Sequence, residues 1–224
     1  MKKLAAGLLA VLLLASAGCG GSDQQADRPP TNRLAAAKRA FDRSPALQIS
    51  LATHDLPRSV AGLLSADGTG THQPAFKGEI KVVQSGLSLT VPVVAVGSKT
   101  WAKLGIWQRV DPTQYNAPDP AGLMSLTHGL SSILTGATGV GKAVTKRRGS
   151  TTVTEIGAKV PGQLMARIVP SADRNALFDA TFTLDKAGRL VAMVLSGSFY
   201  PSADDTTYTF SFTGYGSKST VRAP

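Results

Sequence analysis

Residues that could act as nucleophiles or metal ligands are few and scattered in this sequence. Cys19 is the only cysteine, which excludes a disulfide framework, a cysteine-based zinc site and a CxxC redox pair. The three histidines, His54, His72 and His128, are far apart, and none forms an HExxH motif or a His-x-His pair. The composition therefore argues against most metal chemistry, and we predict neither a metal site nor a cofactor.

A hydrolase would need an exposed nucleophile beside a general base. The sequence has no GxSxG motif, and its nearest fragment, Ser196-Gly197-Ser198, lies in a predicted strand. Asp67 and the Asp204-Asp205 pair lie in turn-like sequence, where aspartate is common for conformational reasons. We therefore predict that the protein is not an enzyme; a buried Ser–His contact would favour a hydrolase instead.

Residues 136–143, GATGVGKA, nearly match the phosphate-binding P-loop GxxxxGK[ST]. Position 143 is alanine, so the hydroxyl that would bind Mg²⁺ is missing. The segment before the loop has a helical pattern, whereas a P-loop follows a buried strand. We predict a glycine-rich connection that does not bind nucleotides.

The densest positive cluster follows this loop and consists of Lys142, Lys146, Arg147 and Arg148. Nucleic-acid binding would favour aromatic side chains among such residues, but none occurs between positions 116 and 177. We therefore predict no nucleic-acid partner. Two interpretations remain open, a solvated hairpin and a contact with anionic lipid headgroups.

The N-terminus has the layout of a secretory signal. Lys2 and Lys3 precede an uncharged apolar run over residues 4–15, which is short for a membrane span of roughly 20 residues. Ser16-Ala17-Gly18 and Cys19 follow and resemble a bacterial lipobox, although Ser16 stands where that motif usually has leucine. We predict a signal peptide over residues 1–18 and a lipid-modified Cys19; the alternative is a secreted protein with an incidental cysteine.

Residues 20–31, GGSDQQADRPPT, lack large apolar side chains and are typical of a flexible tether. With Cys19 they form a lipidated segment over 19–31. Loss of Lys2 and Lys3 lowers the net charge from +10 to +8. Two or more acyl chains would anchor such a protein stably in a membrane, whereas one would be marginal.

The remaining elements must be placed by periodicity. The chain has 224 residues, 42% of them hydrophobic and 17% charged, which excludes a disordered chain and a multi-span membrane protein. Alternation of apolar and polar residues predicts strands in hairpin succession, over 47–51, 76–82, 87–96, 100–104, 107–110, 145–158, 178–184, 190–200 and 206–215. Helical spacing predicts helices over 32–43, 119–134 and 160–168. We expect one α+β domain over 32–224, with a mainly antiparallel sheet.

Trp101, Trp107 and Tyr115 cluster within fifteen residues. Aromatic residues with a polar tip suit either a core or the rim of a pocket, and both interpretations remain open here.

The order of these features resembles the LppX/LprA/LprF/LprG family of mycobacterial lipid-binding lipoproteins. The resemblance rests on features spread over nearly the whole mature chain, namely Gly78-Glu79-Ile80, the apolar strand 87–96, the Trp101–Trp107 hairpin, Asp111-Pro112 with Tyr115, the segment 119–123, the helix 129–134, the strand end 157–160 and the closing strands. The resemblance implies a strongly curved antiparallel sheet, like half a barrel, with helices packed over its concave face, a fold similar to that of the periplasmic lipoprotein carriers of Gram-negative bacteria. It also implies a large apolar cavity between sheet and helices that binds acylated glycolipids or other long-chain lipids.

Apolar residues of the strands and of segment 119–134 would line this cavity. They are Leu87, Leu89, Val91, Val93, Leu123, Leu126, Leu130, Ile133, Phe182, Leu184, Met193 and Leu195. Glycine and serine residues beside Leu123–Ile133 would leave room for acyl chains. Both faces of strand 87–96 are apolar, so its inward face cannot be assigned from the sequence.

We therefore expect a lipoprotein anchored in the cell membrane of an actinobacterial envelope, facing the periplasm or cell wall. It would bind acylated lipids or glycolipids and carry them across the envelope, with an envelope transporter as a candidate partner. The alternative is a structural or adaptor lipoprotein with a packed core that docks on an envelope protein or transporter. A large empty cavity would favour the carrier, and a solid interior the adaptor.

Overall fold

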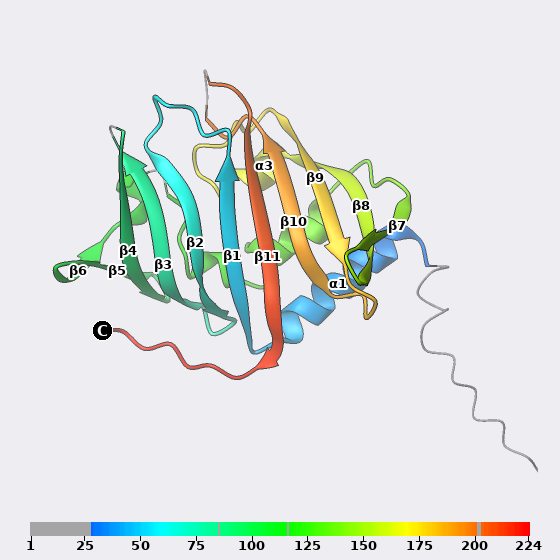
Figure 1. The fold of residues 1–224 in the computed structure, drawn as a ribbon, viewed down its shortest axis with the longest axis horizontal. Helices are drawn as coiled ribbons and strands as arrows, with labels where there is room; N and C mark the ends of the chain where they lie inside the picture. Colours follow the sequence, from blue (N-terminus) through cyan, green and yellow to red (C-terminus); the bar gives the residue numbers. More distant parts are fainter. Residues whose placement is uncertain (1–27, 85, 116, 201–202) are drawn as a thin grey trace, which may run out of the picture.

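The computed structural model describes residues 28–84, 86–115, 117–200 and 203–224. Eleven strands form one curved, antiparallel open sheet, which confirms the predicted fold class (Figure 1). Their order across the sheet is β6-β5-β4-β3-β2-β1-β11-β10-β9-β8-β7. The strands are β1 Ala46–His54, β2 Gly62–Thr71, β3 Ala75–Gln84, β4 Leu87–Val96, β5 Lys99–Leu104, β6 Ile106–Val110, β7 Ala143–Arg148, β8 Thr151–Pro161, β9 Leu177–Leu184, β10 Leu190–Gly197 and β11 Thr206–Ser217.

The described residues form three α-helices, α1 Pro30–Arg43, α2 Leu130–Gly136 and α3 Gly162–Met165, which cover only part of the sheet. In Figure 1 they lie behind β8–β11, and α1 begins beside β7. The buried face of α1, Leu34, Ala37 and Phe41, belongs to the main hydrophobic core together with residues of β1 and β8–β11. This covered face is the concave face of the sheet.

The connection from β6 to α2 covers the lower ends of β2 and β3. It contains two 3₁₀ turns, η2 Pro112–Tyr115 and η3 Gly122–Met124, and η3 contacts β2 and β3. Ala121 packs against Phe76 and Ala95 in a small cluster separate from the main core. The connection leaves the upper ends of β3–β6 without a covering helix.

Several predicted element boundaries are wrong. Residues 119–134 do not form one helix, because Ser125 and Gly129 are extended and divide the segment into η3 and α2. The predicted strand 145–158 is a hairpin of β7 and β8, turning at Gly149 with φ +60°. β8 continues to Pro161, so α3 is one turn rather than the predicted helix 160–168.

Candidate functional site

All the predicted site residues on strands share one face of the sheet. Directly paired residues in antiparallel strands have side chains on the same face. The register carries one row of such pairs across the sheet: Val91–Ile80–Ala66–Leu51–Phe210–Met193–Phe182–Ile156. Three predicted residues, Val91, Met193 and Phe182, belong to this row. The other five lie an even number of positions from one of them on the same strand and therefore point to the same face: Leu87, Leu89, Val93, Leu184 and Leu195. All eight predicted strand residues thus lie on the concave face.

Under the helices this face is filled by packed side chains. The residues concerned are almost completely buried in one core cluster: Leu130, Ile133, Phe182, Leu184, Met193 and Leu195, at 0–1% exposure. Two pockets stand out among the described residues, and both are open depressions on the surface. Neither is an enclosed chamber between sheet and helices.

Only the first part of segment 119–134 lies near β4, where Ala121 packs against Ala95. Its helical part, α2, packs on α1, α3 and β8, at the other end of the sheet. Leu123 is half-buried and Leu126 is 47% exposed, so neither lines a cavity with Leu130 and Ile133. Gly129 leaves no free volume either, because a Cβ on it would lie 2.5 Å from the Ser125 carbonyl oxygen and would overlap that of Leu123.

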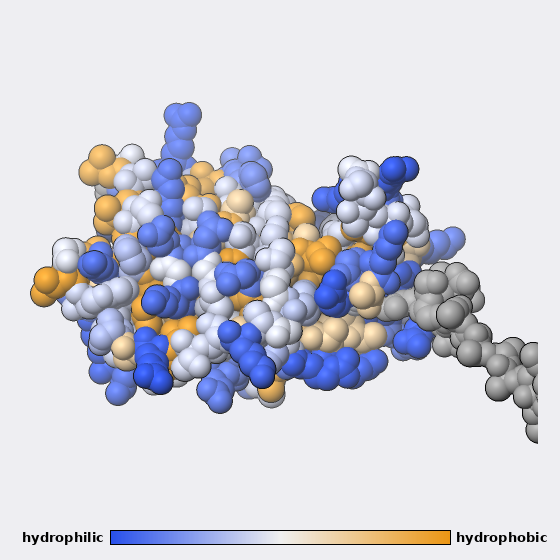
Figure 2. Space-filling model, turned by 60° about the horizontal axis from the view of Figure 1, so that its bottom comes forward, coloured by the Kyte–Doolittle hydropathy of each residue, from blue (hydrophilic) through white to orange (hydrophobic). Residues whose placement is uncertain are grey.

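The uncovered end of the concave face carries four exposed apolar side chains. Leu87 and Leu89 of β4 are 78% and 53% exposed, Leu104 of β5 is 47% exposed, and Ile106 of β6 is 72% exposed. The pairs Leu89↔Val82 and Val91↔Ile80 continue this surface onto β3, where Ile80 and Val82 are half-buried. We name Leu87, Leu89, Leu104 and Ile106 the open apolar surface; hydrophobic residues show at this end of the molecule in Figure 2.

The pairing of β4 explains why this surface stays open. β5 pairs only with residues 93–96 of β4, and Pro92 has no N–H with which to extend a ladder. The pairing of β3 with β4 is continuous through Pro92, without a bulge, whereas the pairing of β4 with β5 ends beside this residue. Below the open surface, Val91 and Val93 are buried with Ala102. The exposed Leu87 and Leu89 therefore adjoin well-packed apolar residues on the same face.

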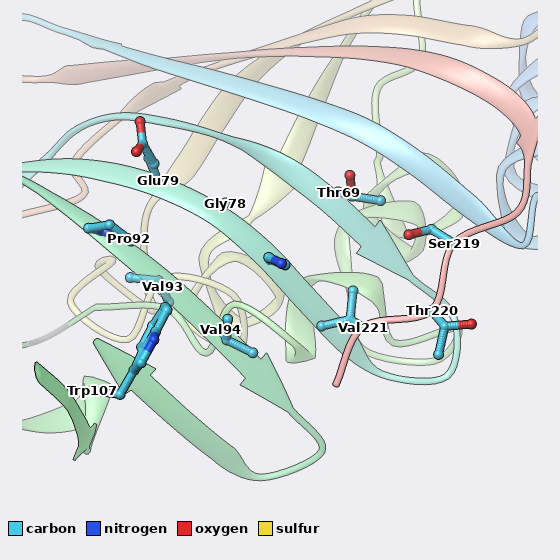
Figure 3. A pocket seen from close by; sticks show the side chains of 11 residues that line it. Thr69, Gly78, Glu79, Pro92, Val93, Val94, Trp107, Ser219, Thr220 and Val221 are labelled. Atoms are coloured by element: carbon cyan, nitrogen blue, oxygen red, sulfur yellow. The ribbon is translucent and has the colours of Figure 1, made fainter. Parts of the chain in front are cut away.

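The convex face has a depression that the sequence did not indicate. It has a volume of about 470 Å³ and lies between β2–β4, Trp107 and the C-terminal segment 219–221 (Figure 3). Val221 lies across β3 and β4 beside Val94, which is buried although it points away from the helices. Trp107 lines this groove at 36% exposure, so its indole belongs to the rim of a pocket rather than to the core.

The second depression has a volume of about 730 Å³ and mixed polar and apolar walls. Val60, residues 170–175 and Tyr200 line it. The hydroxyls of Tyr200 and Tyr208 are 2.8 Å apart, and burial raises the pKa of both phenols. Both phenols therefore stay neutral, and the hydrogen bond between them holds Tyr200 at the wall of this depression.

The other candidate chemistries gain no support from the described residues. Both ring nitrogens of His72 lie near backbone carbonyl oxygens, 2.7 Å from Met124 O and 3.0 Å from Phe41 O. The imidazole therefore links η3 to α1 and does not act as the general base of a serine nucleophile. Residues 136–143 connect a helix to a strand, the reverse of the P-loop order. Within the described ranges there is no group of three or more potential metal ligands, and no helix is long and apolar enough to cross a membrane. Cys19 lies outside those ranges.

Comparison with known proteins agrees with this architecture. The family model described as LppX_LprAFG lipoprotein matches residues 29–221. LprF from Mycobacterium bovis superposes with a TM-score of 0.71 at 15% identity, over 92% of this chain and 99% of that one. LppX from Mycobacterium tuberculosis superposes with a TM-score of 0.63 at 17% identity, over 86% and 97%. Comparison of the sequence with curated proteins finds no match.

Proposed function

Since the chain belongs to the LppX_LprAFG lipoprotein family, we propose that it binds the acyl chains of a long-chain lipid or glycolipid and carries them across the cell envelope. The open apolar surface is the observation that carries this proposal. Water-exposed leucine and isoleucine side chains gathered on one face mark a binding site for an apolar partner. Each CH₂ group of an acyl chain buried there contributes about 0.8 kcal/mol.

The proposed site takes in only the β4 residues of the set expected from the sequence. Residues under the helices are already packed, so an acyl chain would lie on the uncovered end of the concave face, over Leu87, Leu89, Val91 and Val93. Polar groups of the lipid would face solvent beyond the β5–β6 hairpin. Leu130, Ile133, Phe182, Leu184, Met193 and Leu195 would support the site from the adjoining core.

The double variant Leu89→Asp/Leu104→Asp tests this location. Two carboxylates on the open apolar surface are expected to weaken binding of cis-parinaric acid, a fluorescent 18-carbon fatty acid, by at least about tenfold, because charges are costly beside an acyl chain. Leu177→Asp is the matched control, since Leu177 is 62% exposed on the convex face of β9. Fluorescence titration measures the affinity, and thermal unfolding confirms that all variants fold. Equal weakening by the control, or none by the double variant, would contradict the proposed site.

A second function is favoured by the packed half of the molecule. A filled core beneath the helices suits an adaptor lipoprotein that presents its surface to an envelope protein or transporter. Mass spectrometry of organic extracts from protein purified out of its native envelope separates the two functions. A carrier is expected to co-purify with stoichiometric long-chain lipid, and an adaptor is expected to be free of it.

The membrane anchor is proposed to be Cys19. Its replacement in the Cys19→Ala variant is expected to move the protein from the membrane fraction to the soluble fraction, because the acyl chains that hold it are lost. Detergent-phase partitioning and immunoblotting measure the distribution. Substitution of the neighbouring Ser22→Ala serves as the control and should leave the protein with the membrane; a Cys19→Ala protein that stays there too would disprove the assignment.

A further inference from the structure

The basic residues noted in the sequence gather on the β7–β8 hairpin, at one edge of the sheet. Lys146 and Arg148 lie on the convex face, with side chains 55% and 61% exposed. Arg147 has the opposite parity and projects on the other face of the hairpin. Lys142 is exposed directly before β7. The hairpin therefore presents positive charge on both faces of a free sheet edge.

One carboxylate holds two of these cations in place. Glu155 of β8 is 2.6 Å from Lys146 Nζ and 2.5 Å from Arg148 Nη2, and its side chain is only 9% exposed. Hydrogen bonds from Lys146 and then Arg148 lower the pKa of this carboxyl, so it stays ionised. Glu155 is the only acidic residue between positions 120 and 172, so the hairpin keeps a positive excess. Within the described residues, neither Lys142 nor Arg147 forms an ion pair.

The hairpin lies next to the start of the described chain. Arg33, in the first turn of α1, donates from Nη2 to Thr154 Oγ1 of β8 over 2.7 Å. Figure 1 shows α1 beginning beside β7, and in Figure 2 hydrophilic side chains surround that end of the molecule. Arg28 follows Cys19 by nine residues, which reach at most about 30 Å when fully extended. An anchor at Cys19 would thus keep this hairpin, and not the β4–β6 end, close to the bilayer.

We propose that the β7–β8 hairpin, through Lys142, Lys146, Arg147 and Arg148, is a docking surface for the anionic headgroups of the anchoring membrane. The proposal rests on the anchor at Cys19 and adds a protein surface to it. Positive side chains close to an anionic leaflet are attracted within a Debye length of about 10 Å, each changing the partition coefficient roughly fivefold. The far edge, β6, lies ten strand spacings away, or about 45–50 Å along the sheet. Docking at β7 would therefore orient the open apolar surface away from the anchoring bilayer.

The test uses the full chain with Cys19→Ala, which removes the acyl anchor. Ser150→Cys, at the tip of the β7–β8 hairpin, then supplies the only thiol for a fluorophore. Energy transfer to headgroup-labelled lipid is measured in phosphatidylcholine vesicles with and without 30% phosphatidylglycerol, at low and high salt. We expect transfer that requires phosphatidylglycerol and disappears at high salt. A label at Ser98→Cys, in the β4–β5 turn, is expected to give weaker transfer.

Charge variants separate the hairpin from overall net charge. Lys142→Gln/Arg147→Gln removes two cations without leaving Glu155 unpaired, and should weaken phosphatidylglycerol-dependent binding about 25-fold. Lys81→Gln/Lys103→Gln removes the same charge from β3 and β5 and should change it less than twofold. Equal losses in both variants, stronger transfer from Ser98, or no dependence on phosphatidylglycerol would each overturn the docking surface. Failure of the anchor itself is seen separately, as Cys19→Ala protein that stays with the membrane at high salt and still partitions into the detergent phase.

Discussion

The Gly78→Ala variant is expected to unfold at a midpoint about 6–12 °C below that of the unmodified protein. Gly78 of β3 pairs with Gly68 of β2 and with Val93 of β4. A Cβ on Gly78 would lie 2.6 Å from Gly68 Cα and would overlap the Asp67 carbonyl oxygen. These neighbours are backbone atoms, which cannot move aside like a flexible side chain. We expect a loss of about 3 kcal/mol, near the upper end for overpacking, and 1 kcal/mol corresponds to about 2–4 °C in a domain of this size.

Gly157 of β8 is the matched control for this substitution. It also lies in a strand interior, but a Cβ there would meet no atom within 4 Å. Gly157→Ala is therefore expected to be neutral or to stabilise the protein by up to about 1 kcal/mol, because alanine restricts the unfolded chain. Thermal and urea unfolding of both variants measure the difference. Similar midpoints for the two variants would show that β2 and β3 are not so close at this position.

Truncation of a side chain to alanine is expected to lower the free energy of unfolding much more in the helix-covered half of the concave face than in the uncovered half. Phe182 is completely buried, and its pairs are Met193 and Ile156. Phe182→Ala should cost about 3–5 kcal/mol, since it leaves a cavity among side chains that the helices hold in place. Leu89 occupies the same face but is 53% exposed, so Leu89→Ala should cost less than about 1 kcal/mol. Urea denaturation measures both free energies.

The two variants also discriminate between the functions considered above. A small cost at Phe182 would mean that the interior under the helices is not firmly packed, and an acyl chain could enter there. A large cost at Leu89 would mean that the open apolar surface is covered in solution. Fatty-acid binding by Phe182→Ala protein should be unchanged if the lipid lies over β3–β6.

Much of the fold follows from period-2 alternation in the sequence. The pattern Tyr208, Phe210, Phe212 is correctly read as a strand, and all three side chains are buried on the concave face. β2, with the sequence GLLSADGTGT, has no strong β pattern, because close pairing with β3 requires glycine at position 68 and the side chains of Met124 and Ile49 fill the space beside Gly70. Helical spacing at Leu123, Leu126, Leu130 and Ile133 was misleading, since Gly129 is an extended N-cap that interrupts the helix.

The site was harder to predict than the fold, for a physical reason. Parity fixes which strand residues share a face, and the eight strand residues named from the sequence do share one. Burial depends instead on where the helices pack, and α1 and α2 pack on the β8–β10 side. The same alternation thus gives a filled core at Phe182 and exposed side chains at Leu87 and Leu89. Val221 packs on the convex face, and its position could not be predicted because the segment around it has no apolar–polar periodicity.

The strand order also sets when the protein can finish folding. β1 and β11 are neighbours at the centre of the sheet, and Ser217 Oγ bonds the Ala46 carbonyl across 171 residues of sequence. Closing so long a loop is slow, and here it requires β11, the last of the described strands. As the chain is made from its N-terminus, β1–β6 would form with β1 lacking a partner on one side, and β7–β10 would form with β10 in the same situation. The two halves would join only once β11 is available, so until then the unfinished sheet exposes two strand edges that can pair with other chains.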